Sequence, residues 1–395
     1  MKRNMILLIS FALLLTGCWD QRELSTITIV TGMAIDKGEK GNFKMTIEGI
    51  NSTELYSQTA EGNSPSVVFS LEGETIAELA YKMNIGFSKN VIYSHMRIMV
   101  ISKAIAESGM LEFLDAFERS RDLRDDFDFI IAKDGEAAEI LKVVYIYQKA
   151  SSLKLMSQLE TATKVWGSTV DVQIKDFIRA LTSPGRQPVI TAVKVKGNPK
   201  KGESVDNMKK TSPDAMVIID SMGVFKDDKL IGFLSVEDIR NYLWTQNQIK
   251  STSLSVPCGE KRYAAIRVED SNTKLKGHIK DGKPKIRVDI VLQGSIFGST
   301  CKGHMDDPET YKKIEEFTNQ YVKDEVLKTI QTVKDDYGVD IFGFGEVVYR
   351  QDYKQFKKVE DHWDEVFKDA EIDVSVETMI RRAGLRTKGV FDRMK

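Results

Sequence analysis

Cys18 is the residue whose position most clearly predicts chemistry. It ends the tetrapeptide Leu15-Thr16-Gly17-Cys18, and an almost unbroken apolar run over residues 5–15 precedes it, behind two basic residues. A run of about 11 residues is too short to cross the roughly 30 Å hydrocarbon core of a bilayer as a helix, but it suits the central part of a secretory signal. The ending matches the lipobox of bacterial lipoproteins. We therefore predict cleavage between Gly17 and Cys18 and attachment of S-diacylglycerol and N-acyl chains to Cys18, with a plain secretory signal as the alternative.

The two other cysteines are Cys258 and Cys301. A location outside the cytoplasm would permit a disulfide between them. The sequence gives no distance between the two residues, and a disulfide needs a specific one. We therefore expect two separate buried thiols rather than a bond.

Residues that could form a catalytic or metal centre are scattered. Cys301 and His304 lie three residues apart, but two candidate ligands do not make a zinc site and no second pair follows at a fitting distance. Gly343-Phe344-Gly345 lacks the third glycine of a dinucleotide fingerprint, and no phosphate-binding loop or nucleophile elbow occurs. We predict no catalytic residue, no metal site, no cofactor and no enzyme activity. The residues considered for these roles include His95, His278, His304, His362, Asp125, Asp126, Glu315, Glu316, Trp19, Trp166, Trp244 and Trp363.

The composition is that of a folded protein without a strong electrostatic field. Basic and acidic residues number 57 and 58, which leaves a formal net charge of −1. This balance gives no general attraction for nucleic acid. No later segment approaches 18 uninterrupted apolar residues, so the lipid is the expected anchor.

The elements that would carry these residues alternate between strands and helices. Residues 25–51 alternate on both sides of a Gly-containing turn, which is typical of a β-hairpin. Strands are further expected over 66–71, 91–101, 127–132 and 188–195, with helices over 74–83, 110–117, 136–144, 151–162 and 170–181. Residues 196–213 contain Gly, Pro and Lys and little that could enter a core, so we predict a linker or a long exposed loop there.

The second half predicts a hairpin over 215–234, a helix capped by Ser235, and successive strands over 251–256, 263–268, 275–279 and 285–297. A long helix follows from Asp306 or Asp307 to about residue 336, with Pro308 in its first turn. Residues 351–367 are expected to be helical and 372–379 to form an edge strand. Runs of strands with helices laid on them favour an α+β fold. We expect mostly antiparallel sheets and more than one domain.

The predicted organisation has five parts. Residues 1–17 form the signal, 18–195 an N-terminal α+β domain, 196–213 the linker and 214–380 a C-terminal α+β domain that is divisible near 257. Residues 381–395 form a basic tail. A solvated end is the expected state of this tail, and contact with anionic lipid headgroups is the alternative.

An ordered set of motifs resembles the Ger(x)C family, the lipoprotein C subunit of GerA-type spore germinant receptors. The set begins with Trp19-Asp-x-Arg-Glu-Leu24 directly after the lipobox. It continues through Gly32–Asp36, Ser94–Ser102, Gly223–Gly232 and Asp340–Gly345. The resemblance covers almost the whole chain. The order of these motifs is more specific than a lipobox alone.

The resemblance implies a non-catalytic subunit of a nutrient germinant receptor. It also implies a location on the outer face of the inner spore membrane, where two polytopic membrane subunits are the partners and the lipidated Cys18 reaches the bilayer. The stimulus would be a small nutrient such as an amino acid, sugar or nucleoside. Only Cys18 takes a role directly from the family. Two competing classes are a substrate-binding lipoprotein of an ABC importer, which would show repeated βα units around a cleft, and an enzyme of the cell envelope.

Overall fold

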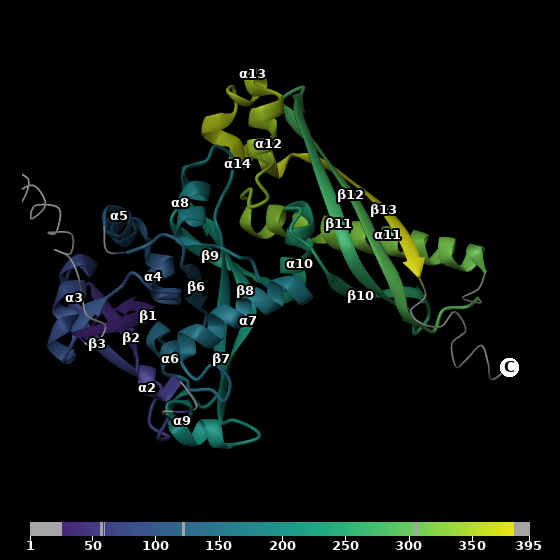
Figure 1. Cartoon of the computed structure of the whole chain (residues 1–395). Coiled ribbons are helices and arrows are strands. Elements are labelled where there is room, and N and C mark those ends of the chain that lie inside the picture. The colour runs from purple at the N-terminus through teal and green to yellow at the C-terminus, as the bar shows by residue number, and fades with distance from the viewer. Residues whose placement is uncertain (1–25, 56–57, 59, 121–122, 304–306, 383–395) are drawn as a thin grey trace, which may run out of the picture.

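The computed structural model describes residues 26–55, 58, 60–120, 123–303 and 307–382, and within them the strands form two sheets. Figure 1 shows the first sheet and its helices on the left and the second sheet on the right. The first sheet has the order β3-β2-β1-β5-β6-β7-β8-β9, with β4 paired to β1. Its strands are β1 (Ile27–Lys37), β2 (Phe43–Ile50), β3 (Ser66–Gly73), β4 (Asn90–Ile92), β5 (Ile98–Ser102), β6 (Asp128–Ala132), β7 (Val189–Gly197), β8 (Ala215–Lys226) and β9 (Lys229–Ser235).

The directions of these strands follow the length of the connections between them. Strands joined by short turns, such as β1–β2 and β8–β9, are antiparallel. The central pairs β1–β5, β5–β6 and β6–β7 are parallel, and helices connect β5 to β6 and β6 to β7. A parallel pair needs such a crossover because its second strand must start again at the same end. The predicted α+β class is confirmed, and the parallel centre is a feature that the prediction lacked.

Helices cover both faces of the first sheet. One face buries Met33, Ile101 and Phe129 under one group of helices, while the other face buries Val100 and Ile130 under a second group. Strands that are covered on both faces read as continuous apolar runs, as β5 does with Ile98–Ser102. The first group contains α3 (Ile76–Lys82), the 3₁₀ turn η2 (Met83–Gly86), α4 (Lys103–Ser108), α5 (Leu111–Arg119) and α8 (Ile174–Thr182). The second group contains α6 (Ala137–Lys142) and α7 (Ser151–Val165), and the short α2 (Ser52–Leu55) follows β2.

The second sheet is covered on one face. It has the order β10-β11-β12-β13, and its residues alternate between buried and exposed. The long helix α11 (Pro308–Thr332) packs on the buried face through Ile314, Val322, Val326 and Ile330. The strands are β10 (Thr252–Gly259), β11 (Arg262–Lys280), β12 (Lys283–Ser299) and β13 (Glu371–Arg382).

The long helix confirms its predicted start signals. Asp307 is the N-cap and accepts a hydrogen bond from the backbone N–H of Glu309, while Pro308 occupies the first turn. A π-helical turn, η4 (Val333–Tyr337), ends the helix at Gly338, which has a φ of 64°. Short helical pieces follow at the top of Figure 1: α12 (Phe344–Gln351), α13 (Tyr353–Phe356), η5 (Glu360–His362) and α14 (Trp363–Lys368). They replace the single helix predicted over 351–367.

The helix α10 (Val236–Thr245) joins the two sheets. Ser235 and Asp238 form a capping box at its start, as the cap at Ser235 predicted. Every residue from Ile239 to Thr245 is buried. Its apolar side chains belong to one core that contains both Val224 of β8 and Val268 of β11. The two sheets are therefore joined through a shared core rather than through a flexible connection.

The predicted linker over 196–213 differs from the structure. It connects β7 to β8, which are neighbours in the same sheet and pair from Gly197↔Ala215 onward. The segment carries α9 (Pro199–Gly202) and η3 (Val205–Lys209). The side chain of Asn207 in this segment is buried, and its Nδ2 donates hydrogen bonds to the backbone carbonyls of Val144 and Ala215. Its polar composition marked a connection correctly, but the change from one sheet to the other falls at α10.

Two predicted strand limits also differ. The strand expected over 91–101 is interrupted by a turn in which the Met96 N–H bonds the Tyr93 carbonyl, and this turn separates β4 from β5. The strands expected over 263–268 and 275–279 are one strand, β11. Its middle, residues 269–274, is polar in sequence, and a bulge at Val268/Asp270 shifts which side chains face the core, so the alternation is broken there.

Candidate functional site

Three predicted features lie outside the described residues. They are the signal with its cleavage point and Cys18, the histidine His304, and the basic tail beyond Arg382. Lipid attachment at Cys18 therefore stays a prediction.

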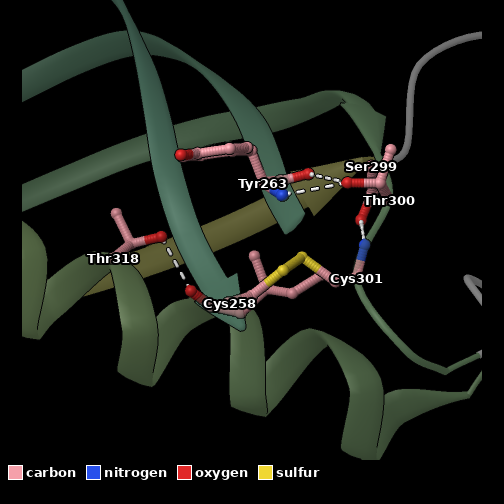
Figure 2. The surroundings of a disulfide bond; sticks show 7 residues. Cys258, Tyr263, Ser299, Thr300, Cys301 and Thr318 are labelled. Carbon is pink, nitrogen blue, oxygen red and sulfur yellow. Dashed lines mark hydrogen bonds between the residues drawn. A yellow bond between two sulfur atoms is a disulfide. The ribbon is translucent and has the colours of Figure 1, made fainter. Parts of the chain in front are cut away.

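The prediction of two separate thiols at Cys258 and Cys301 is wrong. The two residues form a disulfide with a Cα–Cα distance of 5.7 Å. Figure 2 shows the bond joining the end of β10 to the chain that follows β12, beside Thr318 of α11. Two hydrogen bonds join Tyr263 and Thr300 next to it: the Thr300 N–H donates to the Tyr263 carbonyl at 2.9 Å, and the Tyr263 N–H donates to the side-chain Oγ1 of Thr300 at 2.9 Å. The strand pairing β10–β11–β12 brings the cysteines together, and sequence spacing alone carried no sign of it.

The other candidate residues do not converge. Within the described ranges, no three His, Cys, Asp or Glu side chains gather in a way that could hold a metal ion. Cys301 is in the disulfide, so it offers no thiolate to a metal. Trp244 and Trp363 are buried in the core, and Gly343 is the N-cap of α12 with a φ of 73°. The glycine-containing motif is thus the start of a helix.

Buried carboxylates in the motifs hold the starts of helices. Asp36, at the end of Gly32–Asp36, accepts hydrogen bonds from the backbone N–H groups of Ala137 (2.7 Å) and Ala138 (3.0 Å) at the start of α6. Burial raises the pKa of this carboxyl, and the two backbone bonds oppose the rise. An anion at a helix N-terminus satisfies donors that have no partner within the helix. The role of Asp36 is therefore structural.

Asp340 has the same role in the second region, which consists of the second sheet, α11 and the short helices that follow it. Its side chain is fully buried and accepts hydrogen bonds from Gly343 N–H (2.9 Å), Gly345 N–H (2.8 Å) and Trp363 Nε1–H (2.9 Å). Desolvation raises the pKa of Asp340 to about 6, although these donors stabilise its charge. Asp340 thus ties the start of α12 to α14.

Glu48 is a third such carboxylate, and sequence reasoning missed it. It accepts from the backbone N–H groups of Ser151 (2.9 Å) and Ser152 (3.0 Å) at the start of α7, and from Ser66 Oγ (2.9 Å). Its position in β2 reads as the polar face of an alternating strand. Because helices cover both faces of this sheet, that face is buried. Burial is the main cause that raises the pKa of Glu48.

A polar hollow of 260 Å³ lies between α7 and the start of β6. Asp128 and Asp171 line it together with Glu160 and Arg97. Burial raises the pKa of Asp128 to about 7, and the negative charges of Asp171 and Glu160 add to the rise while Arg97 opposes it. Asp128 therefore keeps its proton more readily than an exposed aspartate does.

An open groove of 650 Å³ runs along α7 beside β8. Its wall includes Tyr147 and Val165, which are 84% and 63% exposed. Lys154 lies in the same groove, and burial lowers its pKa to about 8. Its ammonium donates to the Val217 carbonyl at 2.8 Å and lies 4.4 Å from the centre of the Tyr145 ring. Through the hydrogen bond to Val217, Lys154 holds α7 against β8.

A bridge of polar side chains connects the two regions. Arg186, which precedes β7, donates to Gln246 Oε1 (2.8 Å), the Tyr242 hydroxyl (3.1 Å) and Glu346 (3.3 Å). Gln187 donates through its backbone to the Asp340 carbonyl at 2.8 Å. These hydrogen bonds hold the two sheets in a fixed relation to each other.

Across the described part of the chain, no helix is long and apolar enough to cross a membrane.

The fold and its buried carboxylates define a class: an α+β protein of two joined sheets whose internal charges position helices. A family described as "Spore germination protein N-terminal domain" matches residues 20–195. A second description, "Spore germination B3/GerAC like, C-terminal", matches residues 220–384. The chain belongs to the Ger(x)C family of spore germination proteins.

Several relatives are similar over their full length. Spore germination protein KC of Bacillus subtilis (strain 168) is 29% identical over 99% of this chain and 98% of its own length. Spore germination protein B3 of the same organism is 22% identical, with 94% of this chain and 95% of the relative covered. Spore germination protein GerQC of Bacillus cereus is 21% identical, with 98% and 99% covered. The crystal structure of the GerBC protein matches 88% of this chain and 97% of that chain, with a TM-score of 0.57 and 18% identity, and it shares the fold.

Proposed function

We propose that this chain is the lipid-anchored C subunit of a nutrient germinant receptor and that it acts by binding rather than catalysis. The observation that carries the proposal is the full-length similarity to spore germination proteins, together with Cys18 two residues before the first family match begins. Two polytopic membrane subunits are its partners. Its place is the outer face of the inner spore membrane.

Three buried carboxylates have structural rather than chemical roles, which agrees with a binding role. Asp36, Glu48 and Asp340 are occupied by backbone donors, so these buried carboxylates are not available to a substrate. A tethered protein needs only a modest interface, since tethering raises its effective concentration near its partners to about the millimolar range. Loss of the lipid is therefore expected to weaken assembly sharply.

The first experiment is germination of spores that lack this chain, measured with single nutrients, beside an uptake assay in growing cells. Loss of the response to one set of nutrients with unchanged uptake supports the proposal and identifies the stimulus. Unchanged germination together with a defect in uptake would contradict it and favour the substrate-binding lipoprotein of an importer.

A second experiment addresses the anchor. The variant Cys18→Ala should lose labelled fatty acid, leave the membrane fraction and respond poorly to nutrients. Cys258→Ser with Cys301→Ser is the matched control, since it removes two cysteines and should keep the fatty acid. Normal membrane retention of Cys18→Ala would contradict the lipid assignment.

A further inference from the structure

Two large apolar side chains project from the surface of the helical segment α3–η2. Tyr81 is 75% exposed and Ile85 is 76% exposed. Tyr81 lies in the last turn of α3 and Ile85 in the 3₁₀ turn that continues it, so the two exposed side chains are little more than one turn apart along the segment. Neither contributes to the core beneath the segment, which uses Ile76, Leu79 and Met83 instead. α3 lies at the left margin of Figure 1, on the side of the molecule away from the second sheet.

The segment that presents them is held rigidly. A Cβ atom on Gly86 would lie 2.5 Å from the Phe69 ring, so the backbone of η2 rests directly on that ring. Phe69 in turn meets Phe87 edge to face, with ring centres 6.0 Å apart. The Asn84 side chain donates to the Tyr81 carbonyl at 3.0 Å and accepts from the Val91 N–H at 2.9 Å. The exposure of Tyr81 and Ile85 is therefore a fixed feature of the surface.

The same segment lies beside the start of β1. β4 pairs with the first residues of β1, with Ile27 opposite Asn90 and Thr28 opposite Val91. Thr28 and the Phe87 ring also meet over Gly49, where an added Cβ would lie 2.8 Å from Thr28 Cγ2 and 3.1 Å from the ring. The chain from Cys18 to this point is short enough to reach at most about 30 Å when extended. A lipid on Cys18 would thus hold the bilayer close to Tyr81 and Ile85.

We propose that Tyr81 and Ile85 insert into the headgroup region of the bilayer that holds the lipid of Cys18. This inference rests on the proposed lipid anchor. A tyrosine suits this position because its ring is apolar and its hydroxyl stays hydrated, and aromatic side chains concentrate at membrane interfaces. The nearby Lys82 is paired with Glu78 at 2.6 Å, so the contact is mainly apolar. A lipid chain alone leaves the protein free to rotate, and this second contact gives it one orientation.

Site-specific photocrosslinking of the full lipidated chain tests the proposal. A benzophenone amino acid is placed at position 81 or 85, and at the exposed positions 147 and 297 as controls, which are 84% and 77% exposed. The proteins are reconstituted in phosphatidylglycerol–phosphatidylcholine vesicles that contain a labelled phospholipid. Positions 81 and 85 should give roughly fivefold or more lipid adduct than the controls, because only they lie at the interface. Equal yields at all four positions would overturn the inference.

Labelled fatty acid on Cys18, measured in the same samples, separates the two ideas. Fatty acid present with equal adduct yields would leave the anchor intact and remove the contact at Tyr81 and Ile85. Absence of fatty acid would overturn the anchor and the inference with it. A second measurement uses the chain with Cys18→Ala, whose residual binding to the same vesicles should fall on the order of tenfold when Tyr81→Ser and Ile85→Ser are added. Phe297→Ser should leave that binding unchanged.

Discussion

The two sheets of this protein are built to opposite plans. The first is enclosed by helices on both faces, and a chain of edge-to-face rings from Phe113 through Phe129 and Phe177 to Phe225 crosses one of its layers. The second has α11 on one face and solvent on the other, and its strands alternate between buried and exposed residues, with one shift at the bulge in β11. The enclosed sheet depends on internal packing and on carboxylates such as Glu48. The one-sided sheet is stabilised by the pairing of its long strands and by a disulfide.

Loss of the disulfide should have the largest effect and should be confined to the second sheet. The bond closes a loop with a sequence separation of 43 residues. A loop of this size is worth about 4 kcal/mol of unfolding free energy. Hydrogen exchange on Cys258→Ser/Cys301→Ser should show faster exchange in β10–β12 and unchanged protection in β5–β7. Equal loss of protection in both sheets would mean that the shared core around α10 makes them one cooperative unit.

Asp340→Asn compares the two regions through their buried carboxylates. At least one of the three donors would then face an amide NH₂ group instead of an acceptor, so we expect the variant to lose about 3 kcal/mol of unfolding free energy at pH 4. Because the folded pKa of Asp340 is raised to about 6, the folded state holds this proton more tightly than the unfolded state. The contribution of Asp340 to wild-type stability therefore falls as the pH rises from about 4 to 6. Urea unfolding should show a smaller difference in unfolding free energy between wild type and variant at pH 7 than at pH 4.

Two variants sharpen this result. Glu48→Gln is the matched change in the first region, and it should lower the protection of α7 rather than that of α12. Asp361→Asn alters an exposed carboxylate and should leave stability unchanged at both pH values. A gap for Asp340→Asn that stays constant with pH would contradict the raised pKa.

Asp128→Asn should stabilise the first region by an amount that grows as the pH rises from about 4 to 7. At pH 8 the wild-type carboxylate is ionised beside Asp171 and Glu160, and its folded pKa is raised to about 7. The amide removes the repulsion and the cost of burying the charge, which we expect to add about 1–2 kcal/mol of unfolding free energy. At pH 4, near the pKa of an unfolded aspartate, the difference between variant and wild type should be smallest. Thermal unfolding at the two pH values tests this, and a variant that is less stable at pH 8 would contradict it.

The smallest effect is expected from Val165→Ser in the open groove of α7. The side chain is 63% exposed, so its loss should change the unfolding free energy by about 0.5 kcal/mol or less. Leu155→Ala, on the buried side of the same helix, should cost about 2–5 kcal/mol. Similar costs for the two variants, measured by urea unfolding, would show that the groove is part of the core.

The comparison also explains how far the sequence could be read. The strands of the one-sided sheet have alternating apolar and polar residues, so strands near β10, β11, β12 and β13 were predicted. The start of α11 was predicted from its capping residue and Pro308. The enclosed sheet was predicted as separate elements, but its parallel centre and its extent across residues 196–213 were not. Neighbouring strands there are separated by helices in the sequence, and local pattern carries no record of which strand lies beside which.

The residues that hold the fold together were harder to predict than the elements. Glu48 looks like a solvent-facing residue of an alternating strand, and only the second helical layer buries it. Cys258 and Cys301 meet because β10 and β12 both pair with β11, which brings the end of β10 close to the chain that follows β12. The spacing of the two cysteines in the sequence does not show this pairing. The cap at Ser235 was predicted because both of its partners lie within one helical turn.

The placement of β13 has a consequence for the order of folding. β13 pairs in parallel with β12, yet the chain passes through α11, α12, α13 and α14 before it reaches Glu371. A chain that emerges from its N-terminus must therefore hold a long β11–β12 hairpin with an open edge until its last strand arrives. Such an edge is a template for wrong pairing. The interval before residue 371 is complete is when this protein is expected to be most prone to aggregate.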